Sequence, residues 1–234
     1  MDEMTAQCIE GFARQFMSAE PGHDFEHVKR VRNWARIVAR GEGYAALDVV
    51  EAAALLHDIG LPRAEPRRMH GGIGAKMAGQ FLREHGWFPE ETVAEICNAI
   101  RHHCTNRTGS GKLLDILRDA DMMDMFGAMG IIRCVRFASG LPDYAPCDVQ
   151  GPTWGMTAKD FDHRFDMGIG IGETVTDYLN FHISCYDNLV TQTARRLAAP
   201  LAAFISTFVR QLDSEVVANA GGVAPRVNGS NAGS

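Results

Sequence analysis

The chain has 234 residues, a formal net charge of -6 and a hydrophobic fraction of 46%. This composition is typical of a folded globular protein long enough to bury its own core, and it excludes the globally disordered, collagen-like and coiled-coil classes. The negative net charge argues against broad binding of nucleic acid, although a local basic patch can still bind an anionic ligand.

Cysteine spacing and hydropathy indicate a cytoplasmic protein. The six cysteines lie far apart and include no CxxC pair, so we expect free thiols rather than a disulfide framework. No apolar run reaches the roughly 18 residues of a membrane span, and the N-terminal sequence MDEMTAQCIE is acidic rather than signal-like. We therefore predict no membrane association. The sequence carries no signal for an oligomeric state.

Hydrophobic spacing predicts a mostly helical chain. The segment 47–57 is apolar on nearly every side, which is typical of a helix buried among others. Helical patterning resumes at 174 and continues to about 217, with a break expected at Pro200. The other predicted helices cover residues 5–19, 25–40, 74–85, 90–103 and 112–126.

Residues 140–172 are rich in proline and glycine, which predicts one long irregular loop within a single domain over 1–217. We expect this loop to act as a lid over the functional site. The alternative is a surface loop that packs on its own side chains. Residues 218–234 have too little apolar content to pack and are predicted to be a disordered tail. The aromatic side chains of the loop, which are suited to stacking on a substrate, are Tyr144, Trp154 and Phe161. Its carboxylates, which disfavour a highly anionic group nearby, are Asp160, Asp162 and Asp166.

Histidine and aspartate side chains occur at predicted helix ends. His27 lies in HDFEHVKRV, the pair His57-Asp58 ends the apolar helix, and Asp121 lies in LRDADMMD. Imidazole and carboxylate groups that leave water need partners, and a metal ion can partner both. Such ligands suit Mn, Fe, Ni, Zn or Mg with a position left open for water.

The segments HDFEHVKRV, ALLHDIG and LRDADMMD, in that order, resemble the HD-domain metal-dependent phosphohydrolases. FLREHGWFPEETVAEICNAIRHH followed by LRDADMMDMFGAMGIIR is similar to the small bacterial branch related to nucleotide pyrophosphohydrolases. The resemblance implies an all-α fold, an HD-domain helical bundle. It also implies that His27, His57, Asp58 and Asp121 are metal ligands in one cleft.

Further histidines and Asp24 extend this hypothesis. Asp24 is the first candidate for steering the attacking water, and it is equally suited to capping the helix that begins at Phe25. In the HD superfamily, additional histidines often bind a second metal, and His70, His102 and His103 occur in the corresponding order. The alternative is that these three bind phosphate or cap a helix.

Four arginines are candidates for binding an anionic substrate, because guanidinium matches phosphate oxygens and stays charged. Arg30 follows His27 by three residues, and Arg63, Arg67 and Arg68 follow the His57-Asp58 pair. The alternative for such a loop is a solvated surface.

The resulting prediction is a metal-dependent hydrolase of a phosphoester or phosphoanhydride, with a nucleoside triphosphate pyrophosphohydrolase as its specific form. It would use one divalent ion, with two as the alternative, and a small anionic substrate such as a nucleotide. A di-iron oxygenase of a small polar organic substrate is the first rival, and a non-catalytic ligand-binding module is the second. An HD-GYP phosphodiesterase is disfavoured, because Leu61 or Pro62 replaces the lysine usual after the HD pair and no GYP follows.

Overall fold

The computed structural model describes residues 2–17, 24–66, 69–104 and 108–219, and every regular element among them is helical apart from one isolated bridge between Ala145 and Asp148. The predicted all-α class is thus confirmed. The α-helices are α1 (Glu3–Arg14), α2 (Phe25–Gly41), α3 (Leu47–Leu56), α4 (His70–His85), α5 (Glu90–His102), α6 (Lys112–Met123), α7 (Gly127–Phe137), α8 (Ala158–Asp166), α9 (Val175–Ser184) and α10 (Gln192–Asn219), and two 3-10 turns cover η1 (Leu61–Arg63) and η3 (Cys185–Asn188).

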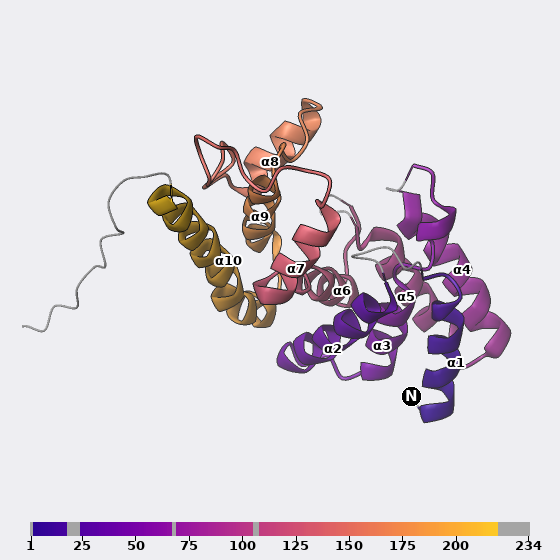
Figure 1. Cartoon of the computed structure of the whole chain (residues 1–234). Coiled ribbons are helices and arrows are strands. Elements are labelled where there is room, and N and C mark those ends of the chain that lie inside the picture. The colour runs from indigo at the N-terminus through magenta and orange to yellow at the C-terminus, as the bar shows by residue number, and fades with distance from the viewer. Residues whose placement is uncertain (1, 18–23, 67–68, 105–107, 220–234) are drawn as a thin grey trace, which may run out of the picture.

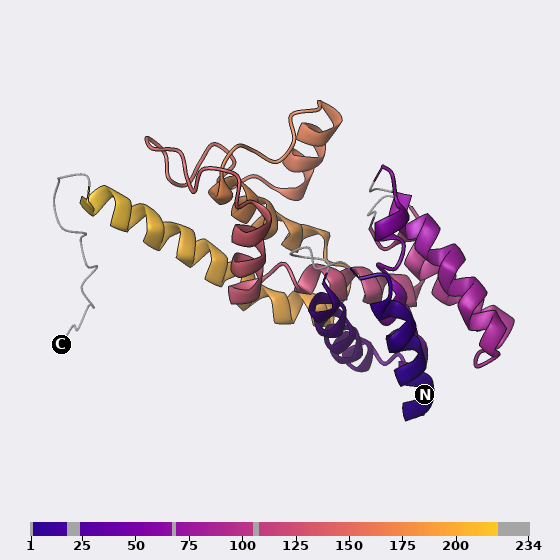
Figure 2. The ribbon, with the colours of Figure 1, turned by 45° about the vertical axis from the view of Figure 1, so that its right-hand side comes forward.

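The helices form two neighbouring groups. Helices α1 to α5 lie on one side, α7 to α10 lie on the other, and α6 lies between them (Figures 1 and 2). Helix α6 packs against α2, α3 and α5, and it also contacts α10. A second, smaller apolar cluster is formed where α7, α9 and α10 meet. Helix α6 therefore links the two groups, and its last turn lies where they join.

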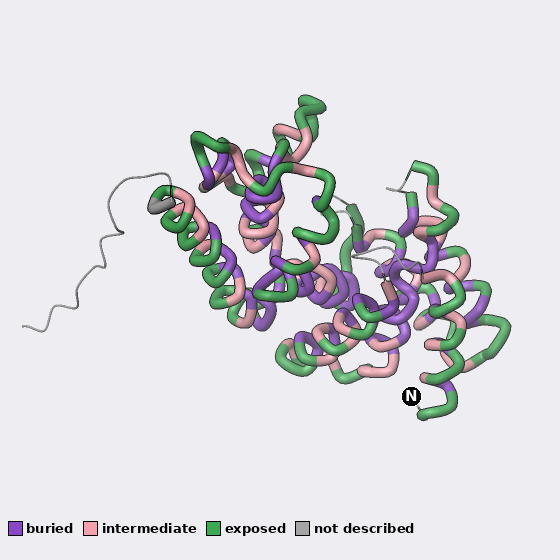
Figure 3. The backbone as a smooth tube through the Cα atoms, in the orientation of Figure 1, coloured by how far each residue is buried: buried purple, intermediate pink, exposed green. Residues whose placement is uncertain are grey.

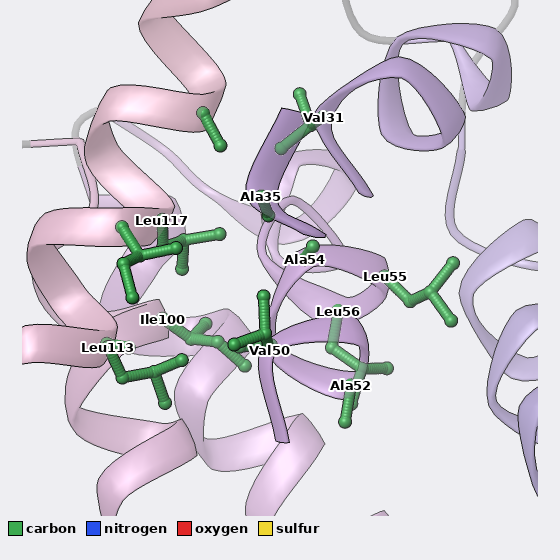
Figure 4. Close-up of a cluster of buried hydrophobic side chains, with 14 of the residues drawn as sticks. Val31, Ala35, Val50, Ala52, Ala54, Leu55, Leu56, Ile100, Leu113 and Leu117 are labelled. Atoms are coloured by element: carbon green, nitrogen blue, oxygen red, sulfur yellow. The ribbon is translucent and has the colours of Figure 1, made fainter. Parts of the chain in front are cut away.

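Helix α3 is the centre of the larger core. Seven of its ten residues are buried, as expected of a helix that is apolar on nearly every side. Val50 of this helix lies next to Ile100 of α5 (Figure 4), and Leu56 and Leu113 of α6 belong to the same buried cluster. The backbone drawing shows the same concentration of buried residues around α3 (Figure 3). This packing fixes the end of α3, from which the His57-Asp58 pair follows.

A close backbone approach places the next helix. A Cβ atom added to Gly60 would lie 2.2 Å from the carbonyl oxygen of His70 and 2.5 Å from the backbone nitrogen of Gly74. Only glycine fits between the turn after α3 and the first turn of α4. The absence of a side chain at Gly60 therefore lets His70 lie next to the residues that end α3.

The helix predicted over 5–19 ends at Arg14, and two further helical predictions were wrong in detail. The helix predicted over 112–126 ends at Met123, and α7 begins separately at Gly127, whose φ of 66° turns the chain. Pro200 does not break the C-terminal helix, because it lies inside α10. The break occurs instead at Val190 and Thr191, whose backbone N–H groups donate to the buried carboxylate of Asp119 on α6. A tertiary hydrogen bond decides where α10 begins, and local propensity alone does not report it.

The segment 140–172 is not irregular throughout. It contains α8, which begins with a capping box in which Thr157 and Asp160 satisfy each other's backbone N–H groups. Trp154 packs on the smaller apolar cluster. Phe161 is 1% exposed and contacts Phe181 of α9. This part of the segment is therefore a packed element that carries its own helix.

Candidate metal centre

Side chains from five helices or their ends gather in one buried cluster. His27 comes from the first turn of α2, the His57-Asp58 pair follows α3, and Asp121 comes from the last turn of α6. His70 begins α4 and His103 follows α5. The structure thus brings the four predicted ligands together with two of the three additional histidines, as the ion-pair distances below show.

Each of three imidazoles is oriented by a hydrogen bond through Nδ1. His57 and His103 both follow the last residue of a helix, and their Nδ1–H groups donate to the carbonyl oxygens of Ala54 and Ile100, at 2.8 and 2.7 Å. His27 Nδ1 lies 2.7 Å from Oδ2 of Asp124. These bonds direct the Nε2 atoms of all three rings toward the cluster, which is how metal-binding histidines are commonly held.

The carboxylate of Asp58 lies between two groups of imidazoles. Its Oδ2 atom is 3.3 Å from His57 Nε2 and 3.7 Å from His27 Nε2. Its Oδ1 atom is 3.4 Å from Nε2 of both His70 and His103. Because the two oxygens face different imidazole pairs, this one side chain is placed to serve both groups.

Asp121 completes the first group. Its Oδ1 atom lies 3.2 Å from His27 Nε2 and 3.9 Å from His57 Nε2. In the second group, one ligand atom from each of His70, His103 and Cys104 lies within 4.8 Å of the others. The Nε2 atoms of His70 and His103 are 3.1 Å apart.

The residues present fit a divalent cation. Ligand atoms bound to one such ion at about 2.1 Å lie roughly 3 to 3.4 Å from one another, close to the shorter separations observed. His57 Nε2 is buried and has no hydrogen-bond partner among the described residues. Its lone pair is therefore available to coordinate a cation. Two carboxylates among neutral imidazoles leave a charge of about -2, which one divalent ion offsets. The buried cluster is therefore consistent with the metal site of an HD domain.

The protonation of the cluster reflects the same charge imbalance. Burial by itself lowers the pKa of His27, but hydrogen bonds to Asp121 and Asp124 outweigh it and raise that pKa to about 9. Burial opposes protonation of His70 as well, and its contacts with Asp58 and Cys104 raise its pKa to about 10. Burial favours a neutral Asp121, yet the hydrogen bond with His27 holds the pKa of this carboxyl below its usual range. Protons thus occupy imidazoles that a cation would otherwise use.

A cleft of about 910 Å³ opens onto this cluster. Asp58, His70, His103 and Asp121 line it on one side, together with Arg101 of α5. Half of its other lining residues come from α8, α9 and η3. The volume lies in the range of small-molecule sites in proteins.

Asp24 and two of the four predicted arginines do not belong to the lining of this cleft, and the other two arginines lie outside the described residues. Asp24 is the N-cap of α2, and its carboxylate accepts from the His27 backbone N–H at 2.9 Å. Arg30 binds Asp124 through two hydrogen bonds. The guanidinium of Arg63 lies 5.2 Å from the ring centroid of Phe16. Arg67 and Arg68 lie outside the described residues.

His102 and its neighbours show which of the adjacent residues reach the second group. His102 lines the cleft, but its Nδ1 is engaged with the hydroxyl of Thr108 at 3.0 Å. Its neighbours His103 and Cys104 join His70 instead. The prediction therefore included a histidine outside the second group and omitted a thiol within it.

Sequence reasoning also missed Asp124, Arg133 and Arg101. Asp124 is 1% exposed and accepts from His27 and from Arg30, while Arg133 Nη1 lies 2.6 Å from its Oδ2 atom. The signal for Asp124 was its spacing, because it follows Asp121 by one helical turn in LRDADMMD. Arg101 was adjacent to the histidines that were singled out.

Comparison with known proteins identifies the class. Residues 24–132 match the family model of the HD domain. The Bacillus subtilis protein YpgQ, described as uncharacterized, is 26% identical over 218 residues, which cover 83% of this chain and 85% of YpgQ. Residues 24–132 of this chain thus form an HD domain, and the chain as a whole is similar to YpgQ-like bacterial proteins.

Solved structures agree on the fold. A protein from an uncultured Thermotogales bacterium, described as a predicted HD superfamily hydrolase, is 26% identical with a TM-score of 0.61, and 92% of each chain is covered. A Lactobacillus plantarum protein is 25% identical with a TM-score of 0.64, over 93% of this chain and 99% of its own. YpgQ crystallised in complex with ADP is 22% identical with a TM-score of 0.59, over 91% of this chain and 95% of YpgQ.

Membrane insertion has no candidate among the described residues. None of their helices combines the length and the apolar character that crossing a bilayer requires.

Proposed function

We propose that this protein is a metal-dependent hydrolase of phosphoanhydrides, with nucleoside triphosphates as its substrates. One observation carries the proposal: the Asp58 carboxylate lies between two imidazole groups at the base of a cleft large enough for a nucleotide. The HD-superfamily descriptions of the relatives and the ADP bound by YpgQ support it.

His27, His57, Asp58 and Asp121 would hold the principal ion. When bound, a divalent ion lowers the pKa of a water molecule and polarises a phosphoryl oxygen. The Nδ1 hydrogen bonds to Asp124 and to the Ala54 carbonyl keep His27 and His57 oriented. Arg101, exposed on the cleft wall, is placed to bind the phosphate chain through charge-assisted hydrogen bonds.

The reaction is a substitution at the α-phosphorus. The oxygen of water forms a bond to that phosphorus, and the bond from phosphorus to the bridging oxygen of the β-phosphate breaks. The products are a nucleoside monophosphate and pyrophosphate, and the two protons of the water pass to the products and the solvent. Asp24 is removed from the role of steering water in this proposal, because its carboxylate caps α2.

The direct test is product analysis. Protein loaded with Mn²⁺ is incubated with nucleoside triphosphates, and pyrophosphate and inorganic phosphate are measured separately. Release of pyrophosphate with one equivalent of monophosphate supports the proposal. Release of inorganic phosphate alone assigns the cleavage to another bond, and no hydrolysis with Mn²⁺, Fe²⁺, Ni²⁺, Zn²⁺ or Mg²⁺ overturns the proposal.

The group of His70, His103 and Cys104 favours a second candidate function. With Asp58 Oδ1 it offers ligands for a second ion, and a two-iron centre is what an HD-domain oxygenase of a small polar organic substrate requires. Two irons per chain together with oxygen consumption would favour this candidate over hydrolysis. A single ion per chain would exclude it.

A further inference from the structure

Helices α8 and α9 provide a second wall of the cleft, away from the metal ligands. Five residues of α8 and one of α9 line it, namely Ala158, Phe161, Asp162, Phe165 and Asp166, and Phe181. This wall combines aromatic rings with carboxylates, whereas the wall that includes α5 carries histidine and arginine. The two walls therefore suit different parts of one ligand.

Phe165 is held as an aromatic surface that faces the cleft. The ring centroid of Phe181 lies 5.8 Å from that of Phe165, with the rings perpendicular, and 5.2 Å from that of Phe161 at 72°. Phe161 is 1% exposed, while Phe165 remains 43% exposed. Edge-to-face contacts thus fix Phe165 from one side and leave its ring open to a planar ligand. Stacking on such a ring is a common way to bind a base.

Asp162 and Asp166 lie one helical turn apart and both line the cleft near Phe165. A carboxylate offers about four lone-pair positions, so it can accept hydrogen bonds from more than one donor at a time. Negative charge at this wall disfavours phosphate groups, while Arg101 attracts them on the other wall. A nucleotide is therefore oriented with its base toward α8.

We propose that Phe165, Asp162 and Asp166 form a nucleobase subsite that prefers guanine. This inference rests on the proposed hydrolysis of nucleotides. Guanine presents two adjacent donors, N1–H and the N2 amino group, which match the two oxygens of one carboxylate. Adenine and cytosine offer an amino donor next to a ring acceptor. Uracil and thymine offer one N–H between two carbonyl oxygens, which a carboxylate repels.

Binding and turnover test the subsite separately. We would measure the Kd of GDP and of UDP by calorimetry in the presence of Mn²⁺, and kcat/KM for GTP, ATP, CTP and UTP. The wild type is expected to favour GDP over UDP and GTP over UTP by about 10- to 100-fold, as for one well-paired base edge. Asp162→Asn and Asp166→Asn each replace an acceptor by a mixed donor and acceptor, and at least one of them should reduce the preference about tenfold.

Phe165→Ala should weaken GDP and UDP binding alike, by about 5- to 100-fold, because stacking depends little on the base. Lys159→Ala on the same helix and Phe137→Ala on α7 are the matched controls, since neither residue lines the cleft. Equal Kd values for GDP and UDP in the wild type would overturn the subsite while pyrophosphate release still supported the hydrolase. Loss of pyrophosphate release with a retained GDP preference would overturn the hydrolase and leave the subsite supported.

Discussion

Asp124 accepts a hydrogen bond from His27 Nδ1 at 2.7 Å and is itself held by two arginines. Arg30 contacts it at 2.6 and 3.0 Å, and Arg133 Nη1 lies 2.6 Å from its Oδ2 atom. Burial favours a neutral carboxyl here, but the contacts with His27 and Arg30 lower the pKa of Asp124. The ionised carboxylate accepts the hydrogen bond from Nδ1–H of His27, so Nε2 is the nitrogen that would bind a metal ion once the ion has displaced the proton from it.

Asp124→Asn is therefore expected to weaken Mn²⁺ binding about 10- to 100-fold, the usual cost of losing a partner of a metal-binding histidine. Titration calorimetry measures the affinity. Asp115→Asn, on the helix that Asp124 follows and outside the cluster, is the control and should bind Mn²⁺ as the wild type does. An unchanged affinity in Asp124→Asn would show that the charge of Asp124 is not needed to orient His27.

Removal of the two cluster carboxylates should have different effects, because only Asp58 faces both imidazole groups. Asp58→Ala is expected to abolish metal binding and activity. Asp121→Ala should abolish activity but retain weak binding by the group of His70, His103 and Cys104. Metal analysis after dialysis measures the metal content of each variant, and a pyrophosphate-release assay measures its activity. Circular dichroism should show that both variants keep the helical signal of the wild type. Full metal occupancy in Asp58→Ala would contradict the ligand assignment.

Arg101→Ala should raise KM for nucleoside triphosphates about tenfold with a smaller effect on kcat, because a charge-assisted contact to phosphate is worth about 1.5 to 3 kcal/mol in ground and transition states alike. Arg63→Ala is the matched control, since Arg63 lies over Phe16 and not on the cleft wall. Steady-state kinetics compare the two variants. If Arg63→Ala raised KM and Arg101→Ala did not, the phosphate chain would lie along the loop after α3 instead.

The free energy of unfolding should depend on pH through the titration of His182 on α9. Burial and the nearby charge of Arg133 lower its pKa from 6.5 to about 4 in the folded protein. Between these two values the unfolded chain binds more protons than the folded protein, so the free energy of unfolding falls as the pH drops from 6.5 toward 4. Above 6.5 this contribution is fully present.

His182→Gln removes the titrating group and keeps a side-chain donor. Urea unfolding in EDTA, at pH values of about 5 and about 7.5, should show that the wild type loses about 2 kcal/mol more on acidification than the variant does. Because the remaining histidines are common to both proteins, their contributions cancel. An identical loss in both proteins would contradict a depressed pKa for His182.

The sequence by itself determined the helical class and indicated the four residues that the structure brings together in the principal cluster. Period-3.6 spacing of apolar residues does not depend on distant contacts, so it indicated most helices. The apolar helix ending in His57-Asp58 likewise indicated a polar pair that needed a partner once it was buried. His27 and Asp121 came from their motifs, and the structure brings them next to that pair.

Tertiary structure decided which neighbours take part. Successive residues of a helix point about 100° apart, so His103 faces His70 while His102 does not, and the sequence alone does not set that rotation. Asp124 contacts His27 across 97 positions. The aromatic and acidic wall exists because α8 packs on α9 through Phe161 and Phe181. Such long-range contacts depend on how the helices pack as bodies, and no local pattern records them.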